Sequence, residues 1–283
     1  MSDLFKNNSI SMLYDSSSPL VMGIINVTTD SFFESSRCLS TSQLLEKVDF
    51  FVQNGASIID IGACSTRPNA TFVSEEEEKK RLFPALELLR ANYPSLVISV
   101  DTFRGAIAKE AVESYNVSII NDVFGFDKDD SMLDAVASCA VPYVLTHSLE
   151  IKMENDDFIK EIFRFFADKI AVLQSRGVKD IILDPGYGFG KTMEQNFELL
   201  ARQSELLQFG LPILAGLSRK RMVWQSLNIT PNEALNGTTV LNTIALQQGA
   251  KILRVHDVKE ANEAVRLFSL CNKVSPNSTH HNK

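Results

Sequence analysis

Short apolar runs rich in β-branched residues recur along the chain, and each of them ends in a polar residue. The polar residues that end the eight runs are Asn26, Asp60, Asp101, Asn121, His147 with the preceding Thr146, Asp184, Ser218 and His256. Surface strands alternate apolar and polar positions, whereas these runs are short and continuously apolar. They therefore predict eight buried, parallel strands.

Helical patterns lie between these runs. Ser74 followed by Glu75–Glu78 predicts the start of a helix, because serine caps a helix and acidic side chains favour its positive end. Pro84 is expected to kink that helix or to mark its true start. Apolar residues at helical spacing form three further stripes: Leu44, Leu45, Val48, Phe51 and Val52; Ile159, Ile162, Phe163, Phe166 and Ile170; and Ala261, Ala264, Val265 and Phe268.

The alternation of strands and helices predicts the fold class. Eight strand–helix units in a chain of 283 residues favour a single (β/α)8 barrel of the α/β class, with an open doubly wound sheet as the alternative. We expect the barrel at residues 20–272, an N-terminal extension at 1–19 and a disordered tail at 273–283. Residues at the carboxyl ends of barrel strands build the active site, so the polar residues that end the runs become the candidates.

Composition narrows the function classes. The chain has 35 acidic and 28 basic residues, for a net charge of -7, which argues against a nucleic-acid-binding protein. The four cysteines match no disulfide or zinc spacing. The N-terminus has no secretion-signal pattern, and no apolar run reaches the roughly 20 residues of a membrane span. We therefore expect a cytoplasmic protein with no membrane or nucleic-acid partner.

A glycine-rich segment follows the sixth run, from Asp184 to Thr192. It is not a P-loop, because Pro185 stands where the first glycine belongs, and Lys191 breaks a dinucleotide-binding pattern. What remains is a strand-to-helix loop whose backbone can approach a planar ligand closely.

Basic residues gather at the predicted mouth of the barrel in an otherwise acidic protein. They are Arg67, Lys191, Arg219, Lys220, Arg254 and His256. Arg254 and His256 alternate on the last strand, and a buried, unpaired Arg254 would require a ligand anion. Asp101, Asn121 and Asp184 offer acceptors and an amide that suit the N–H groups of an aminopyrimidinone ring. The pattern indicates a heterocycle with a phosphorylated arm.

The motifs as a set resemble the dihydropteroate synthase family of folate biosynthesis, over about residues 20 to 270. They are Met22–Phe32, Ile59–Gly62, Ser65–Pro68, Val100–Thr102, Ile120–Asp122, Asp184–Thr192, Ser218–Lys220 and Arg254–Val255–His256. The resemblance implies an enzyme, a transferase that joins 6-hydroxymethyl-7,8-dihydropterin diphosphate to 4-aminobenzoate and releases diphosphate. It also implies a homodimer through the last helices.

The resemblance assigns roles to matching residues. Asp101, Asn121, Asp184 and Lys220 match pterin-binding positions, and Asn26 matches a Mg²⁺ ligand. Arg67, Arg254 and His256 match diphosphate contacts, with Val255 between the last two. Thr66, Pro68, Phe189 and Ser218 match the surroundings of the aminobenzoate, and Phe32 belongs to a loop that closes over it. The expected catalytic set is Asp101, Asp184, Lys220, Arg254 and His256.

The chain departs from the family pattern at several positions, namely Thr29, Glu34–Ser36, Asn69, Thr146, Ser148 and Arg221. These changes suggest reduced sensitivity to sulfonamides, which imitate 4-aminobenzoate. A non-catalytic or methyl-carrier pterin-binding barrel is the alternative function; it would need neither the Ser218–Lys220 loop nor the Arg254 and His256 pair. A metal-dependent hydrolase is disfavoured, because the first run ends in Asn26 where such an enzyme needs histidines.

Overall fold

A computed structural model of the chain describes residues 18–27, 41–64, 72–152 and 155–273. The predictions for Thr29, Phe32, Glu34–Ser36, Ser65–Pro68 and Asn69, and for most of the N-terminal extension and the tail, lie outside these residues. No helix in the described ranges is long and apolar enough to cross a membrane.

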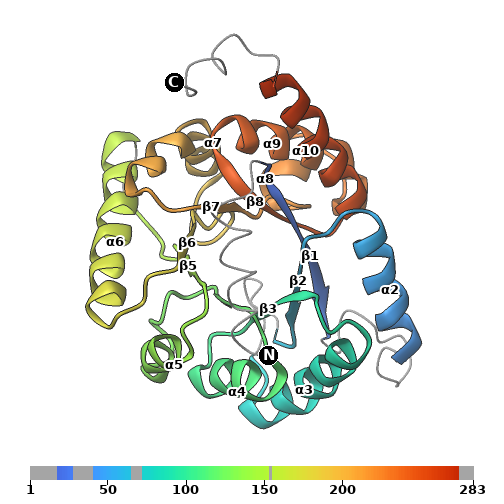
Figure 1. Cartoon of the computed structure of the whole chain (residues 1–283). Helices are drawn as coiled ribbons and strands as arrows, with labels where there is room; N and C mark the ends of the chain where they lie inside the picture. Colours follow the sequence, from blue (N-terminus) through green and yellow to red (C-terminus); the bar gives the residue numbers. More distant parts are fainter. Residues whose placement is uncertain (1–17, 28–40, 65–71, 153–154, 274–283) are drawn as a thin grey trace, which may run out of the picture.

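Eight parallel strands form one closed barrel in chain order, as the sequence predicts, and the open-sheet alternative is wrong (Figure 1). The strands are β1 (Leu20–Asn26), β2 (Ile58–Gly62), β3 (Val97–Asp101), β4 (Ile119–Asp122), β5 (Tyr143–Thr146), β6 (Ile181–Asp184), β7 (Ile213–Ala215) and β8 (Ala250–Val255). β8 pairs with β1 and closes the sheet.

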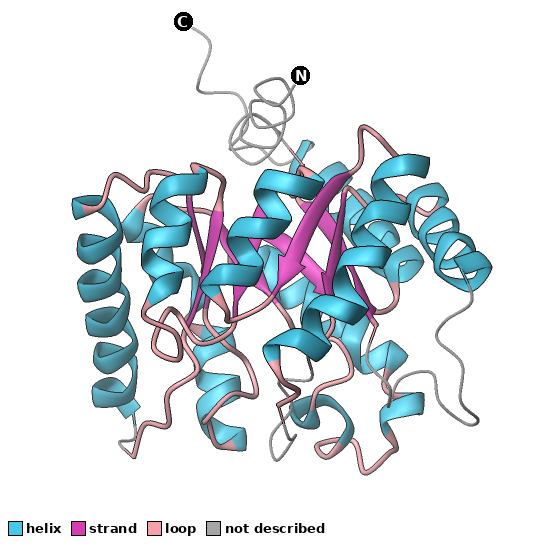
Figure 2. Ribbon diagram, turned by 90° about the horizontal axis from the view of Figure 1, so that it is seen from below, coloured by secondary structure: helices cyan, strands magenta, loops and turns pink. Residues whose placement is uncertain are grey.

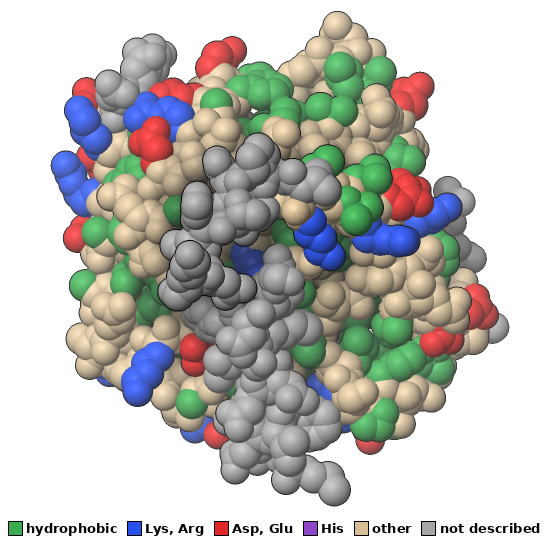
Figure 3. Space-filling view, turned by 45° about the horizontal axis from the view of Figure 1, so that its top comes forward, with side chains coloured by type: hydrophobic (Ala, Val, Ile, Leu, Met, Phe, Trp, Pro, Cys, Tyr) green, Lys and Arg blue, Asp and Glu red, His purple; other side chains and the backbone are tan. Residues whose placement is uncertain are grey.

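Helices surround the barrel (Figure 2). They are α2 (Thr41–Gln53), α3 (Glu75–Asn92), α4 (Gly105–Tyr115), α5 (Ser131–Cys139), α6 (Asn155–Ser175), α7 (Met193–Ala201), α8 (Arg221–Trp224), α9 (Leu235–Gln247) and α10 (Val258–Lys273). Of two short 3₁₀ helices, η2 (Gln203–Phe209) precedes β7 and η3 (Pro231–Glu233) follows α8. The space-filling view shows hydrophobic and charged side chains interspersed over one face (Figure 3).

Helix α3 starts where its sequence predicts. The Ser74 side chain accepts a hydrogen bond from the backbone N–H of Glu77, which caps the first turn. Pro84 lies inside the helix and does not mark its start, contrary to one of the two predictions for it. Three glutamates of the acidic run are solvated or half-buried, but Glu78 is fully buried and pairs with Arg104.

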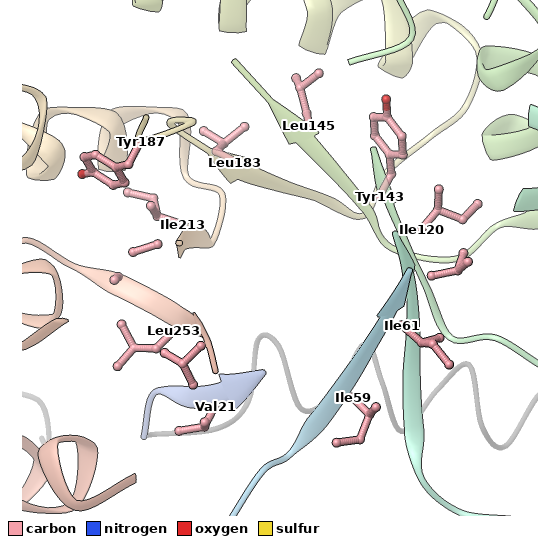
Figure 4. Close-up of a cluster of buried hydrophobic side chains, with 14 of the residues drawn as sticks. Val21, Ile59, Ile61, Ile120, Tyr143, Leu145, Leu183, Tyr187, Ile213 and Leu253 are labelled. Atoms are coloured by element: carbon pink, nitrogen blue, oxygen red, sulfur yellow. The ribbon is translucent and has the colours of Figure 1, made fainter. Parts of the chain in front are cut away.

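Alternate side chains of each strand point to opposite sides of the sheet. Those that point outward pack against the helices in the larger core cluster, which includes Ile59, Ile61, Leu145 and Leu183 (Figure 4). Those that point into the barrel form a second, smaller apolar cluster: Leu20, Met22, Ile58, Ile119, Val144, Ile182, Leu214 and Ile252. This inner cluster fills the amino-terminal half of the barrel, as expected when the interior of a small barrel is packed rather than open.

The inward-facing positions become polar toward the carboxyl ends of the strands. Two residues after Ile58 comes Asp60, two after Ile119 comes Asn121, and two after Ile252 comes Arg254. The period of two keeps these side chains on the inner face. The barrel therefore has an apolar floor with a polar chamber above it, and that chamber holds the candidate site.

Candidate active site

A network of three charged side chains crosses the polar chamber. Arg254 of β8 donates from Nε to Asp60 Oδ2 at 2.7 Å and from Nη2 to Asp101 Oδ2 at 2.6 Å. Asp60 is fully buried, and the Arg254 side chain is 21% exposed. Arg254 is therefore not the unpaired cation that would require a ligand anion, because two carboxylates of the protein bind it.

Asp60, one of the strand-end candidates but without a predicted specific role, is the central acceptor of this network. Its Oδ2 also accepts from Asn121 Nδ2 at 3.1 Å. Its Oδ1 is buried and has no hydrogen-bond partner among the described residues. A buried carboxylate oxygen without a partner is costly, so its position is suited to a donor from a bound ligand or water. The sequence feature that indicates such a role is an aspartate at an inward-facing position of a strand.

Burial governs the protonation of this network. Burial raises the pKa of Asp101 to about 7, with Arg254 opposing the rise and Asp60 adding to it. Burial disfavours the charged form of Arg254, but Asp60 and Asp101 outweigh it and raise the pKa of the guanidinium. Arg254 is thus a permanent cation, while Asp101 changes charge near neutral pH.

Asp184 lies across the chamber at the end of β6. Its Oδ1 accepts from the backbone N–H of Gly186 at 2.7 Å. Burial raises the pKa of Asp184, and Lys220 is the strongest influence in the opposite direction. The Asp184 side chain therefore offers a buried acceptor that one backbone amide orients.

Lys220 approaches the same loop from the segment after β7. Its ammonium donates to the backbone carbonyl of Tyr187 and lies 4.7 Å from the centre of the Phe189 ring, a cation–π distance. Burial lowers the pKa of Lys220 to about 8, and Asp184 opposes that shift. The structure thus brings together Asp184, Phe189 and Lys220, three of the predicted site residues.

Two of the basic residues predicted to bind an anion at the barrel mouth, Lys191 and Arg219, contact other groups of the protein. Lys191 donates to three backbone carbonyls and contacts the His147 ring. Arg219 forms a two-point ion pair with Asp257, at 2.9 Å from Nε and 2.7 Å from Nη2. The charge of Arg219 is thus balanced by Asp257, and the N–H groups of Lys191 are occupied by neutral acceptors of the surrounding loops.

Ser218 and His256 join the ends of β7 and β8. Ser218 Oγ accepts from the backbone N–H of His256 at 3.2 Å and lies 3.1 Å from its Nδ1. Burial lowers the pKa of His256 to about 4, and Arg254 lowers it further, so the imidazole is neutral at pH 7. His256 can donate one N–H to an anion but brings no charge. The Val255 side chain packs outside the barrel in the larger core cluster.

Asn26 ends β1 and is half-buried. Within the described residues no three His, Cys, Asp or Glu side chains form a group that could hold a metal ion. Mg²⁺ commonly takes one or two protein oxygens together with substrate phosphates and water. The Asn26 amide oxygen therefore fits a cation that binds together with a diphosphate, and the donor set does not fit a protein-only metal cage.

Three of the departures from the family pattern lie within the described residues. Thr146 ends β5, is buried, and pairs in register with Asp184. Ser148 is half-buried in the following loop, and Arg221 is exposed at the start of α8. Only Thr146 is thus beside the polar chamber.

Comparisons with known proteins agree with this geometry. The family model described as "Pterin binding enzyme" matches residues 22–256. The dihydropteroate synthase of Escherichia coli K12 is 40% identical over 261 residues, which cover 89% of this chain and 92% of that protein. The dihydropteroate synthase of Bacillus subtilis is 39% identical over 258 residues, which cover 90% and 89%.

The solved structures that this chain resembles include dihydropteroate synthases as well. A Clostridium difficile dihydropteroate synthase, crystallised in the presence of pteroic acid, superposes with a TM-score of 0.86 at 35% identity, covering 90% of this chain and 97% of that one. A Xanthomonas albilineans enzyme with 4-aminobenzoic acid gives a TM-score of 0.85 at 36% identity, covering 92% and 95%. This chain therefore belongs to the dihydropteroate synthase family of pterin-binding enzymes.

Proposed function

We propose that this chain is a transferase that condenses 6-hydroxymethyl-7,8-dihydropterin diphosphate with 4-aminobenzoate to form 7,8-dihydropteroate and diphosphate. The observation that carries the proposal is the polar chamber, where buried Asp60, Asn121 and Asp184 and the mostly buried Asp101 place acceptors above an apolar floor. Adjacent N–H donors of an aminopyrimidinone ring pair well with carboxylate and amide oxygens. The unpartnered Asp60 Oδ1 gives such a ring a further acceptor.

Binding residues divide between the two ends of the substrate. Asp101, Asn121, Asp184 and Lys220 bind the pterin, while Arg67, Arg254 and His256 bind its diphosphate. Because Asp60 and Asp101 already hold Arg254, its part is to set the charge of the chamber as well as to attract the leaving group. A Mg²⁺ ion at Asn26 would add further neutralisation of diphosphate charge.

The chemistry requires one bond to break and one to form. The CH2–O bond breaks and its electron pair leaves with diphosphate, while the dihydropterin ring releases electrons to the carbon. The aminobenzoate nitrogen then forms the N–CH2 bond and loses a proton to solvent. An aromatic amine is neutral at pH 7, so this step needs no strong base. Positioning and charge stabilisation by the protein supply the catalysis.

Aminobenzoate binds beside Phe189 and Ser218 in this proposal, with Thr66, Pro68 and Phe32 completing the pocket. Sulfonamides are expected to compete there, with an affinity that the altered loops weaken relative to that of the substrate. The ratio of a sulfonamide inhibition constant to the Michaelis constant for aminobenzoate, measured before and after Thr29→Pro, tests that expectation.

A homodimer in the cytoplasm completes the proposal. Helices α9 and α10 lie side by side (Figure 1), and each exposes large hydrophobic side chains. Val240 of α9 is 50% exposed, and Leu267 and Leu270 of α10 are 66% and 58% exposed. Apolar groups of this size on neighbouring helices support an interface there. Light scattering of the purified protein and of Leu267→Lys would test it.

The decisive experiment supplies both substrates to the purified protein, with and without Mg²⁺. Formation of dihydropteroate together with equimolar diphosphate supports the proposal. Pterin binding without diphosphate release would instead favour the non-catalytic alternative.

A further inference from the structure

The ammonium group of Lys191 is enclosed by acceptors from two neighbouring segments. It lies 3.0 Å from the carbonyl oxygen of His147 and 3.0 Å from that of Gly186. The Phe189 carbonyl is 3.1 Å away, and Nδ1 of His147 is 3.0 Å away. An ammonium has three N–H groups, so every one of them is used here. Lys191 cross-links the end of β5 to the loop between β6 and α7.

This loop needs such a cross-link because glycine gives it little conformational preference of its own. Gly186, Gly188 and Gly190 have φ values of +71°, +80° and +57°. Glycine visits these angles freely in the unfolded chain, so contacts with the rest of the protein must select the folded conformation. Besides Lys191, one side chain of α7 contributes: Asn196 Oδ1 accepts from Gly188 N–H at 2.6 Å.

The loop carries three groups that face the polar chamber. Its Gly186 N–H orients Asp184, its Tyr187 carbonyl accepts from Lys220, and its Phe189 ring lies 4.7 Å from the Lys220 ammonium. Each of these groups is within three residues of a carbonyl that Lys191 holds. A movement of the loop would displace Phe189 and Lys220 together.

We propose that Lys191 is a positioning residue, which contacts neither substrate but fixes Phe189 for aminobenzoate and Lys220 for the pterin. The inference rests on the proposed function for those two contacts. An apolar side chain of the same length would remove this donor from all three carbonyls, and the Gly186 carbonyl would keep only the backbone N–H of Phe189, at 3.1 Å. Only a side chain with several N–H groups on one atom meets them together.

The charge state of the neighbouring groups agrees with this role. Burial lowers the pKa of His147 to about 3, and Lys191 lowers it further, so the imidazole is neutral and its Nδ1 can accept a hydrogen bond. Burial also lowers the pKa of Lys191 to about 7, while Asp184 favours its charged form. Below that pKa the lysine is an ammonium whose three N–H groups are shared among the three carbonyls and the neutral imidazole.

Lys191→Met tests the proposal, because methionine keeps an unbranched stem and removes every donor. The matched control is Lys179→Met, which changes an exposed lysine just before β6. The measurements are the melting temperature, the dissociation constant of 6-hydroxymethylpterin by calorimetry, and kcat together with the Michaelis constant for aminobenzoate. We expect roughly tenfold increases in the dissociation constant and in the Michaelis constant, with kcat changed less than threefold and wild-type behaviour in the control.

Phe189→Ala separates positioning from general damage. If Lys191 acts on aminobenzoate through Phe189, the double variant should have the same Michaelis constant as Phe189→Ala alone. Should Lys191→Met fail to fold, Lys191→Gln keeps two N–H donors without the charge, and we expect it to fold with Michaelis and dissociation constants above those of the wild type. A folded Lys191 variant with a wild-type Michaelis constant and pterin affinity, or with reduced kcat alone, would overturn the proposal.

The proposed function can fail separately from the role of Lys191. Wild-type protein that binds the pterin but forms no dihydropteroate would contradict the proposed function, and the pterin measurement would still decide the role of Lys191.

Discussion

The two sides of the polar chamber hold their charged groups in different ways. On the side of β2, β3 and β8, the Arg254 guanidinium binds the carboxylates of Asp60 and Asp101 directly. On the side of β6 and β7, the ammonium groups of Lys191 and Lys220 bind backbone carbonyls of the glycine-rich loop.

This difference separates two kinds of preorganisation. On the Arg254 side, the charges fix one another, so removing one leaves the others buried and unbalanced. On the lysine side, backbone atoms position the cations, and Asp184 has no direct ion pair within the described part of the chain. We expect the first side to be sensitive to charge and the second to be sensitive to backbone conformation.

Arg254→Met should give the largest effect, because it leaves Asp60 and Asp101 buried without a cation. Breaking a buried ion pair costs about 3–5 kcal/mol, so we expect a loss of this size from the free energy of unfolding at pH 7, with at least a hundredfold lower kcat/KM. The loss should shrink at pH 5, since Asp101 has a pKa of about 7 and becomes neutral. Chemical denaturation at both pH values measures this.

Arg219→Met is the matched control for that variant. Its ion pair with Asp257 is partly exposed, at 28% and 17%, and exposed pairs contribute about 0–1 kcal/mol. Equal destabilisation by the two variants would show that burial gives the Arg254 network no special weight.

Asp184→Asn should weaken pterin binding while the fold stays intact. The amide oxygen can still accept from Gly186 N–H, but the charged acceptor is lost, which costs about 1.5–3 kcal/mol, or about 10- to 150-fold in affinity. Calorimetric titration measures the affinity, with Asp180→Asn at the opposite end of the strand as the control. Unchanged affinity in the folded variant would remove Asp184 from the site.

The pH dependence of activity should reveal Lys220. Its pKa lies at about 8, below the ordinary 10.5, so kcat/KM should fall as the pH rises through about 8 and the ammonium is lost. The folded protein binds fewer protons here than the unfolded chain, so this group makes folding more favourable as the pH rises from about 8 to 10.5. Activity and stability should thus change in opposite directions. In Lys220→Arg the alkaline decline should disappear; its persistence would assign it to another group.

Gly188→Ala should give the smallest effect and sharpen the comparison most. Gly188 has a φ of +80°, and an added Cβ would lie 3.2 Å from Lys220 Cδ. Gly177 has a φ of +81° with nothing within 4 Å, so Gly177→Ala carries the same backbone strain without the contact. Both variants should lose about 1–2 kcal/mol of stability. Only Gly188→Ala should lower pterin affinity, by a few-fold; an equal change in both would exclude the contact as its cause.

The sequence was sufficient for the barrel because each strand ends in a polar residue and the helices carry clear stripes. It also predicted the chamber residues Asp101, Asn121, Asp184 and Lys220, since strand ends meet at one end of a parallel barrel. The sequence did not show which residues of the protein these side chains bind. Nothing in the spacing of Arg254 shows that Asp60, 194 residues away, holds it.

The roles of Lys191 and Arg219 were missed for a related reason. A cation in a loop looks available when only the sequence is read, because backbone carbonyls carry no sequence signal. The positive φ of Arg219, 54°, and the left-handed glycines of the β6–α7 loop are set by tertiary contacts. Local patterns therefore identify candidate residues, whereas their partners depend on the folded chain.

The glycine-rich loop has a consequence for the evolution of resistance. A methyl group at Gly186 would lie 1.9 Å from the His147 carbonyl oxygen, and one at Gly190 would lie 2.7 Å from the backbone of Leu149 and Glu150. Every other amino acid has a Cβ atom, so any substitution at these two positions produces the same steric clash. An inhibitor anchored to the backbone of this loop would leave the organism few escape mutations there. Inhibitors that depend on side chains of more tolerant loops would lack this protection.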